Sequence, residues 1–120
     1  MTERAAAVVF AEPSGVVRAW NSAAESLFGY GAAEAIGQTL DLIVPPEYRE
    51  SHWAGYRAAM AAADGNTDRG SASIPALHRD GTVIQVEVRL LVIHDSRKRV
   101  AGAMAVFVPA DDSAPPLASM

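Results

Sequence analysis

One histidine, His52, has surroundings that could support chemistry, because it sits inside a segment typical of a long amphipathic helix. Residues 46–63 predict this helix: a proline suits its first turn, and the Asp64-Gly65-Asn66 run suits its end. At about 100° per residue, Tyr48 and Tyr56 lie about 40° on either side of His52. The histidine therefore lies on the stripe that we expect to face inward. There it would be either a core residue with a hydrogen-bond partner or a ligand to a flat cofactor.

The rest of the inward stripe is made of small side chains, which would leave room beside the imidazole. Ala59 and Ala63 fall within about 20° of His52, and Arg49 flanks it at about 60°. The opposite side of the helix carries Glu50, Ala54 and Arg57. Helical geometry alone favours a core histidine, because buried imidazoles are more common than cofactor sites.

The composition is that of one ordinary folded domain, and it excludes several classes of function. Half of the 120 residues are hydrophobic and a fifth are charged, with a formal net charge of −4. We expect no nucleic-acid partner, because no basic patch stands out. The absence of cysteine removes disulfides, thiolate metal sites and cysteine nucleophiles. No signal peptide, membrane-length apolar run, catalytic triad or phosphate-binding glycine loop is found, so we expect a cytoplasmic protein that is neither an enzyme nor membrane-bound.

Apolar runs and turn residues predict strands at both ends of the chain and helices between them. Two N-terminal strands form a hairpin about Pro13-Ser14-Gly15, and the Asp80-Gly81 turn joins two of three C-terminal strands. Asn21 or Ser22 caps the first short helix, and the spacing of Ser22 to Glu25, which is that of a capping box, places its start there. The expected strands span residues 5–11, 16–20, 70–79, 83–93 and 100–108, and the shorter helical pieces span residues 22–28, 32–36 and 39–43.

This order predicts an α+β fold, in which helices cover one face of a five-stranded antiparallel sheet. The most natural ligand space lies between the long helix and that inner sheet face. We expect the folded domain to span residues 5–108, after an N-terminal segment of residues 1–4. The tail, residues 109–120, is expected to be disordered.

The element order and several motifs resemble a PAS domain over nearly the whole chain. The matching stretches are Trp20-Asn21-Ser22-Ala23-Ala24-Glu25-Ser26-Leu27-Phe28-Gly29-Tyr30, Glu34-Ala35-Ile36-Gly37-Gln38, Leu42-Ile43-Val44-Pro45 and the Arg79-Asp80-Gly81-Thr82 turn. The resemblance implies the PAS fold and a role in signal transduction. It leaves the ligand open, because PAS domains hold heme, flavins, small metabolites or no ligand.

Within that family, Arg49-Glu50-Ser51-His52 resembles the Arg-x-x-His at the start of the long helix in heme-binding PAS domains of bacterial oxygen-sensor kinases. The resemblance implies that His52 is the proximal ligand of a heme b iron. A neutral imidazole is a good iron ligand, and an apolar pocket slows oxidation of the iron. The residues expected to bind the cofactor beside it, with the arginines placed at its propionates, are Tyr48, Tyr56, Arg49 and Arg69.

Such a sensor would detect a diatomic gas (O2, CO or NO) or a redox state, and would signal through its sheet and a homodimer. In the oxygen-sensor kinases an arginine on the first C-terminal strand binds the gas, and that position falls at about Ala72 here. Without such a donor, CO or NO becomes the easier ligand. Two other interpretations stay open: a ligand-free module for dimerisation or protein interaction, and a domain that binds a flavin or a small metabolite. Each would act on a signalling partner or an effector domain.

Overall fold

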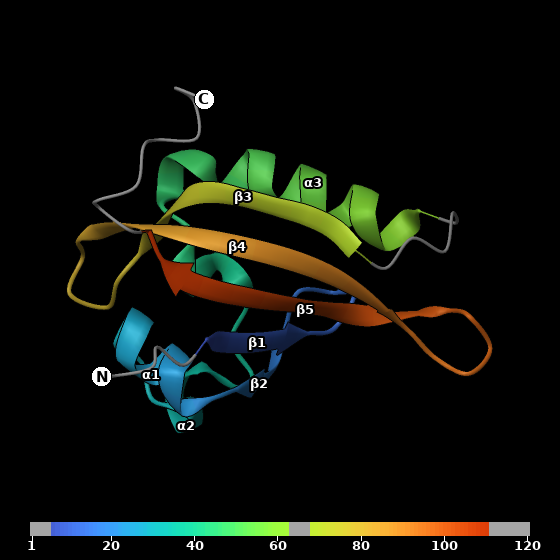
Figure 1. The fold of residues 1–120 in the computed structure, drawn as a ribbon, viewed down its shortest axis with the longest axis horizontal. Helices are drawn as coiled ribbons and strands as arrows, with labels where there is room; N and C mark the ends of the chain where they lie inside the picture. Colours follow the sequence, from blue (N-terminus) through green and yellow to red (C-terminus); the bar gives the residue numbers. More distant parts are fainter. Residues whose placement is uncertain (1–5, 63–67, 111–120) are drawn as a thin grey trace.

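The computed structural model describes residues 6–62 and 68–110, which form a sheet with helices packed on one of its faces (Figure 1). The order of strands and helices is the one predicted from the sequence. The predicted segment 1–4, and the predicted tail beyond residue 110, lie outside the described residues. The elements are β1 (Ala7–Ala11), β2 (Val17–Trp20), α1 (Ser22–Phe28), α2 (Ala32–Ala35), η1 (Leu40–Ile43), η2 (Pro46–Tyr48), α3 (Arg49–Ala61), β3 (Asp68–Leu77), β4 (Val83–His94) and β5 (Val100–Pro109).

All five strands belong to one antiparallel sheet, in the order β2-β1-β5-β4-β3. The first and last strands of the chain pair with each other in the middle of the sheet, where Val9 lies opposite Ala105. The predicted α+β fold with a five-stranded antiparallel sheet is therefore confirmed. β3 is an edge strand, which explains how the sheet accommodates Pro75, a residue without a backbone N–H.

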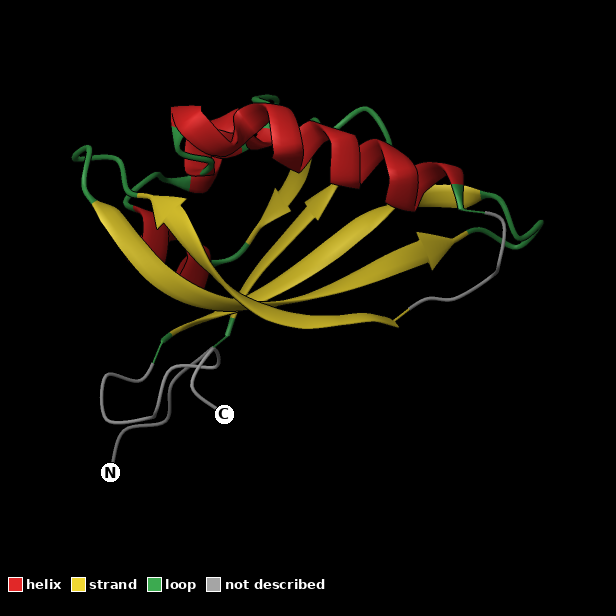
Figure 2. Cartoon of the chain, turned by 90° about the horizontal axis from the view of Figure 1, so that it is seen from above, coloured by secondary structure: helices red, strands yellow, loops and turns green. Residues whose placement is uncertain are grey.

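The sheet curves, and α3 crosses over its concave face (Figure 2). β4 shows the alternation of a sheet with one solvated face: Gln85, Glu87 and Arg89 are exposed, whereas Val86 is fully buried. Every second residue of β4, counted from Val86, therefore faces the helices. They form part of one wall of the space between the two layers.

Asn21 fixes the point where the first hairpin passes into the first helix. Its Oδ1 accepts the backbone N–H groups of Ala24 and Val8, each at 2.9 Å, and its Nδ2 donates to the carbonyl of Ala6 at 3.0 Å. The cap of α1 is thus Asn21, one of the two residues expected, and Ser22 is the first residue of the helix. Asn21 is the cap because its one side chain pairs with backbone groups of both the helix end and the neighbouring strand.

The long helix expected over residues 46–63 is divided in the structure. Its first turn is the 3-10 helix η2, and regular α-helix continues only from Arg49 to Ala61. Tyr48 stands at the junction with φ −108° and ψ 1°, outside the ordinary helical values. The predicted stop at Gly65 lies outside the described residues. At the other end of the chain, Pro109 belongs to β5 and not to a tail.

An aromatic cluster fills one end of the space between the layers. The ring of Phe28 lies 5.5 Å from that of Trp20 and 5.0 Å from that of Phe107, in an edge-on contact with the latter. Trp20 Nε1 donates to the carbonyl of Tyr30 at 2.9 Å, so its one polar atom is satisfied. In the part of the chain that the structure describes, no helix combines the length and apolar character needed to cross a membrane.

Candidate ligand cavity

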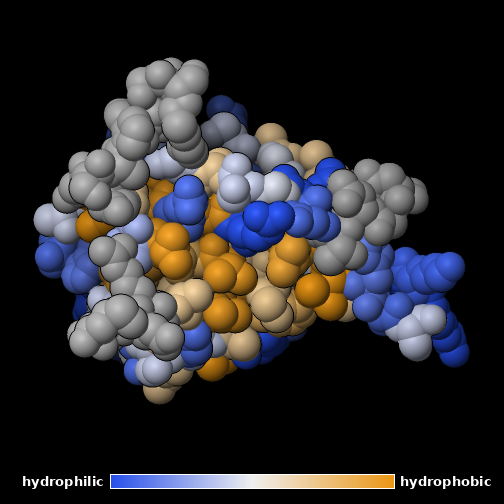
Figure 3. Space-filling model, viewed as in Figure 1, coloured by the Kyte–Doolittle hydropathy of each residue, from blue (hydrophilic) through white to orange (hydrophobic). Residues whose placement is uncertain are grey.

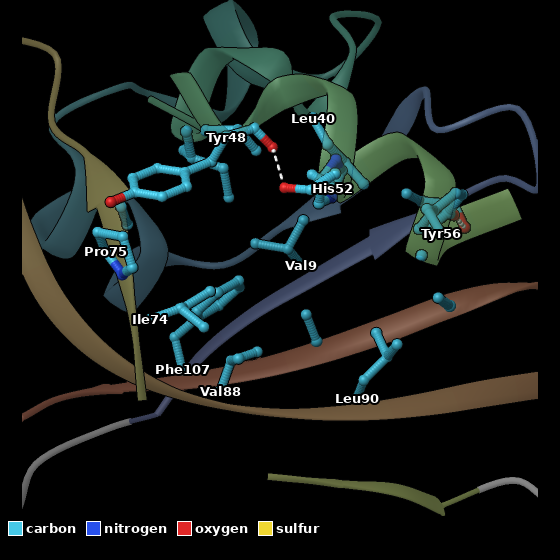
Figure 4. A pocket seen from close by; sticks show the side chains of 18 residues that line it. Val9, Leu40, Tyr48, His52, Tyr56, Ile74, Pro75, Val88, Leu90 and Phe107 are labelled. Atoms are coloured by element: carbon cyan, nitrogen blue, oxygen red, sulfur yellow. Dashed lines mark hydrogen bonds between the residues drawn. The ribbon is translucent and has the colours of Figure 1, made fainter. Parts of the chain in front are cut away.

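A cavity of about 480 Å³ lies between α3 and the inner face of the sheet (Figure 4). This volume is within the usual range for small-molecule and cofactor sites, about 300–1,000 Å³. The sheet wall carries only hydrocarbon side chains, so a ligand there would find no side-chain hydrogen bond. The residues of this wall are Val9, Ala11, Ile74, Pro75, Ala76, Val88, Leu90, Ala103, Ala105 and Phe107.

His52 lines this cavity from α3, together with Ser51 and Tyr56 (Figure 4). Its Nδ1 is buried and has no hydrogen-bond partner among the described residues. Burial lowers the pKa of His52 below the usual histidine value, and the negative charge of Asp41 acts weakly in the opposite direction. The imidazole is therefore neutral at pH 7, with one nitrogen that the protein leaves unsatisfied. An unsatisfied buried atom of this kind costs the folded protein free energy.

Two aromatic residues of α3 pack against the imidazole and fix its position. The ring centroids of Trp53 and Tyr56 lie 5.0 Å and 6.0 Å from that of His52. Trp53 does not line the cavity: its Nε1 donates to Asp41 Oδ1 at 2.7 Å, and its ring lies against Gly15. A Cβ at Gly15 would stand 2.2 Å from that ring, and the φ of +89° there also requires glycine.

Tyr56 lines the cavity with its ring but uses its hydroxyl elsewhere. The hydroxyl donates to the carbonyls of Glu12 and Ala11, at the end of β1. Burial, with a smaller contribution from the charge of Glu12, raises the pKa of Tyr56 to about 12. The residue therefore holds α3 to the first hairpin as a neutral phenol.

Tyr48 lines the cavity from its rim. Its side chain reaches toward Pro75 of β3, and the residue is 47% exposed (Figure 4). Its backbone carbonyl accepts a hydrogen bond from Ser51 Oγ at 3.0 Å. The structure thus brings together three of the five predicted cofactor-binding residues: His52, Tyr48 and Tyr56.

The other two, Arg49 and Arg69, are not among the residues that line the cavity. Arg49 donates from Nε to the carbonyl of Val44 at 3.1 Å and from its guanidinium to the carbonyl of Asp41 at 3.3 Å. Its charge therefore secures the η1 loop to the start of α3. Arg69 is exposed on β3, as is Ala72, the position expected to face a bound gas.

The alanine-rich sheet wall is the part of the site that sequence reasoning missed. Ala103 and Ala105 of β5 alternate with outward residues, and both face the cavity together with Ala11 and Ala76. Period-two alternation in the last strand was the available signal. It did not reveal which strands would be neighbours of β5, and that pairing creates the space.

Comparison with known proteins identifies the fold. The family model described as PAS fold matches residues 4–109. The chain belongs to the PAS family. A crystal structure of the PAS domain of a protein from Colwellia psychrerythraea superposes on it with a TM-score of 0.76 at 24% identity, covering 88% of this chain and 86% of that chain. A light-oxygen-voltage domain studied with a flavin analogue gives a TM-score of 0.68 at 15% identity, covering 89% of this chain and 78% of that one.

A much longer protein contains a stretch that is similar to this chain. An uncharacterized protein from Azorhizobium caulinodans is 30% identical over 102 residues, which is 84% of this chain but 13% of that protein. The present chain therefore corresponds to a small part of that relative. As a PAS domain, it is a sensor domain in general terms.

Proposed function

We propose that this PAS domain senses a diatomic gas through heme b held in the cavity, with His52 as the protein ligand of the iron. The single observation that carries the proposal is a neutral imidazole on the helix wall of a cavity whose sheet wall is wholly apolar. A metal ion needs several ligands, and among the described residues no group of three or more His, Asp or Glu side chains could hold one. A porphyrin brings four ligands of its own, so one histidine is enough.

The fit of heme to these residues is good at the iron and incomplete at the propionates. His52 would offer a ring nitrogen to the iron, and Tyr48 and Tyr56 would offer ring faces to the macrocycle. The basic side chain nearest in sequence, Arg49, is held to carbonyls of the η1 loop, so propionates would extend to solvent at the rim. When bound, heme supplies an iron that can take a gas. The chain's own part is to hold that group, orient it and exclude water.

The chemistry of the sheet wall bears on which gas is sensed. Bound oxygen depends on a hydrogen-bond donor more than carbon monoxide or nitric oxide does, and the side chains of this wall provide no donor. CO or NO is therefore the gas that we propose. A flavin, the main alternative cofactor, fits less well, because its polar ring edge needs amide partners and no Asn or Gln among the described residues lines the cavity.

A second candidate function, pairing with another copy of the chain, is favoured by the outer face of the sheet. Apolar side chains gather there over β1, β4 and β5 (Figure 3). Met104 of this face lies beside Phe10 of β1 and Leu91 of β4. We propose that the face forms a two-fold homodimer interface. Sedimentation should then show a dimer that Met104→Glu converts to a monomer, whereas Ala54→Glu on the exposed side of α3 leaves it unchanged.

A hemin titration tests the heme proposal. Wild-type protein should bind hemin in a one-to-one complex with a sharp Soret band, and His52→Ala should lose that band. Ala105→Leu, which fills the cavity but keeps the histidine, should also lose it. Hemin bound equally by all three proteins would mean that it sits on the surface, and the proposal would fall.

A further inference from the structure

We infer that ligands enter this cavity through the gap between α3 and the edge strand β3, and that Tyr48 is the gate of this entrance. The inference rests on the proposed function only in taking the cavity as the ligand site. It concerns the route and rate of binding, whatever the identity of the ligand.

The exposure of the lining residues locates the entrance. The lining residues that reach solvent most are Tyr48, Ser51 and Gly55, which recur at intervals of three and four along η2 and α3. They therefore form one stripe on a single side of the helix. Across from this stripe lies β3, the edge of the sheet, with Ile74 and Pro75 only half-buried.

The other described walls contain no exposed lining residue. The central strands present buried residues such as Val9 and Ala103, and η1 closes its side with Leu40 and Ile43, both less than 10% exposed. Tyr56 seals the far end of the helix wall through its bonds to the end of β1. Solvent reaches the described part of the cavity from the helix–edge-strand gap.

Tyr48 is the one large side chain of the exposed stripe, and its ring extends across the gap to Pro75 (Figure 4). Its hydroxyl makes no hydrogen bond with any described residue, so packing alone holds the ring in place. A half-exposed aromatic side chain of this kind changes rotamer quickly. Rotation of the Tyr48 ring would open the gap without any movement of the backbone.

Gly55 leaves the same gap open about two turns further along the helix. A Cβ built at Gly55 meets no atom within 4 Å, so a larger side chain fits there. The structure therefore offers two opposite changes. Tyr48→Ala widens the entrance and Gly55→Leu narrows it, and neither alters the buried sheet wall or His52.

The experiment uses fluorobenzene as the probe, because an apolar cavity can bind such a molecule without iron or histidine. Fluorine NMR exchange measures its dissociation rate and its affinity in each protein. Tyr48→Ala should raise both association and dissociation rates about tenfold, and Gly55→Leu should lower both about tenfold, with Kd changed by less than about threefold. Tyr48→Phe, which keeps the ring, should match wild type.

Three results would overturn the inference. The rates could be unchanged in both variants, which would place the entrance elsewhere. Tyr48→Ala could weaken Kd with no faster association, which would make Tyr48 a contact residue. Wild type and all the variants could fail to bind fluorobenzene, which would mean that the cavity admits no ligand. Failure of the heme proposal is distinguishable, because it appears only in the hemin titration.

Discussion

Replacing His52 with leucine should stabilise the ligand-free domain, because the substitution removes a buried polar atom that the protein itself does not satisfy. Functional residues often carry such a cost, and their removal trades binding for stability. The structure allows the stabilising and the destabilising effects of His52→Leu on the free energy of unfolding to be estimated.

The favourable side is the relief of an unpaired buried nitrogen, which is worth about 1–3 kcal/mol. The unfavourable side is the loss of ring contacts to Trp53 and Tyr56, together about 0.5–1.5 kcal/mol. Leucine is apolar and keeps most of the buried volume, so little cavity cost is added. The net expectation is a gain of about 1 kcal/mol in the free energy of unfolding, or a rise of about 4 °C in Tm.

Urea unfolding of ligand-free protein at pH 7.5 measures this change, with His94→Leu, a substitution at the end of β4, as the matched control. The control should change stability by less than about 0.5 kcal/mol. The stabilities of wild type and His52→Leu should also depend differently on pH. Burial lowers the pKa of His52 in the folded state, so the unfolded chain binds the proton first. Wild type should lose stability as the pH falls below about 6.5, and His52→Leu should lack that loss.

A loss of more than about 1 kcal/mol in His52→Leu would refute the reasoning, because that is the behaviour of a satisfied core residue. Equal pH dependence in the two proteins would refute it as well. Either result would return His52 to the role of a structural histidine.

Three further substitutions test how the cavity is held. Tyr56→Phe should cost about 1–2 kcal/mol of unfolding free energy in urea, because two carbonyls of the first hairpin lose their donor, and a neutral result would mean that these bonds are absent in solution. Gly102→Ala should cost more than about 3 kcal/mol, since a Cβ there would stand 2.2 Å from the carbonyl oxygen of Ala11; normal stability would disprove this close approach of β5 to β1. Gly55→Ala should raise stability by about 1 kcal/mol in thermal melts, because the site is open and helical, and a loss would show that the helix is irregular there.

The sequence predicted the fold well because its local signals agreed with one another. Alternation in β4 and the Asp80-Gly81 turn fixed strand positions, and the inward stripe of the long helix placed His52 correctly. Such signals depend on neighbours along the chain, which a sequence displays directly.

The details of the site depended on contacts that no local pattern contains. Arg49 lies one turn from Trp53, yet its guanidinium is engaged by carbonyls of the η1 loop, which no helical spacing could indicate. Nδ1 of His52 is likewise unpaired because of the residues that pack around the ring, and the sequence does not show which these are. The space itself arises where β1 pairs with β5, and strand pairing over this sequence distance is a tertiary property.

The most direct test of the central claim is a nitrogen NMR spectrum of protein labelled with ¹⁵N-histidine, recorded with and without zinc protoporphyrin. The chain has three histidines, so each ring can be assigned by substitution. The account predicts that one imidazole nitrogen of His52 shifts on binding to the metal, while His78 and His94 keep their signals. Unchanged His52 signals in a protein that binds the porphyrin, or a shift at another histidine, would contradict it.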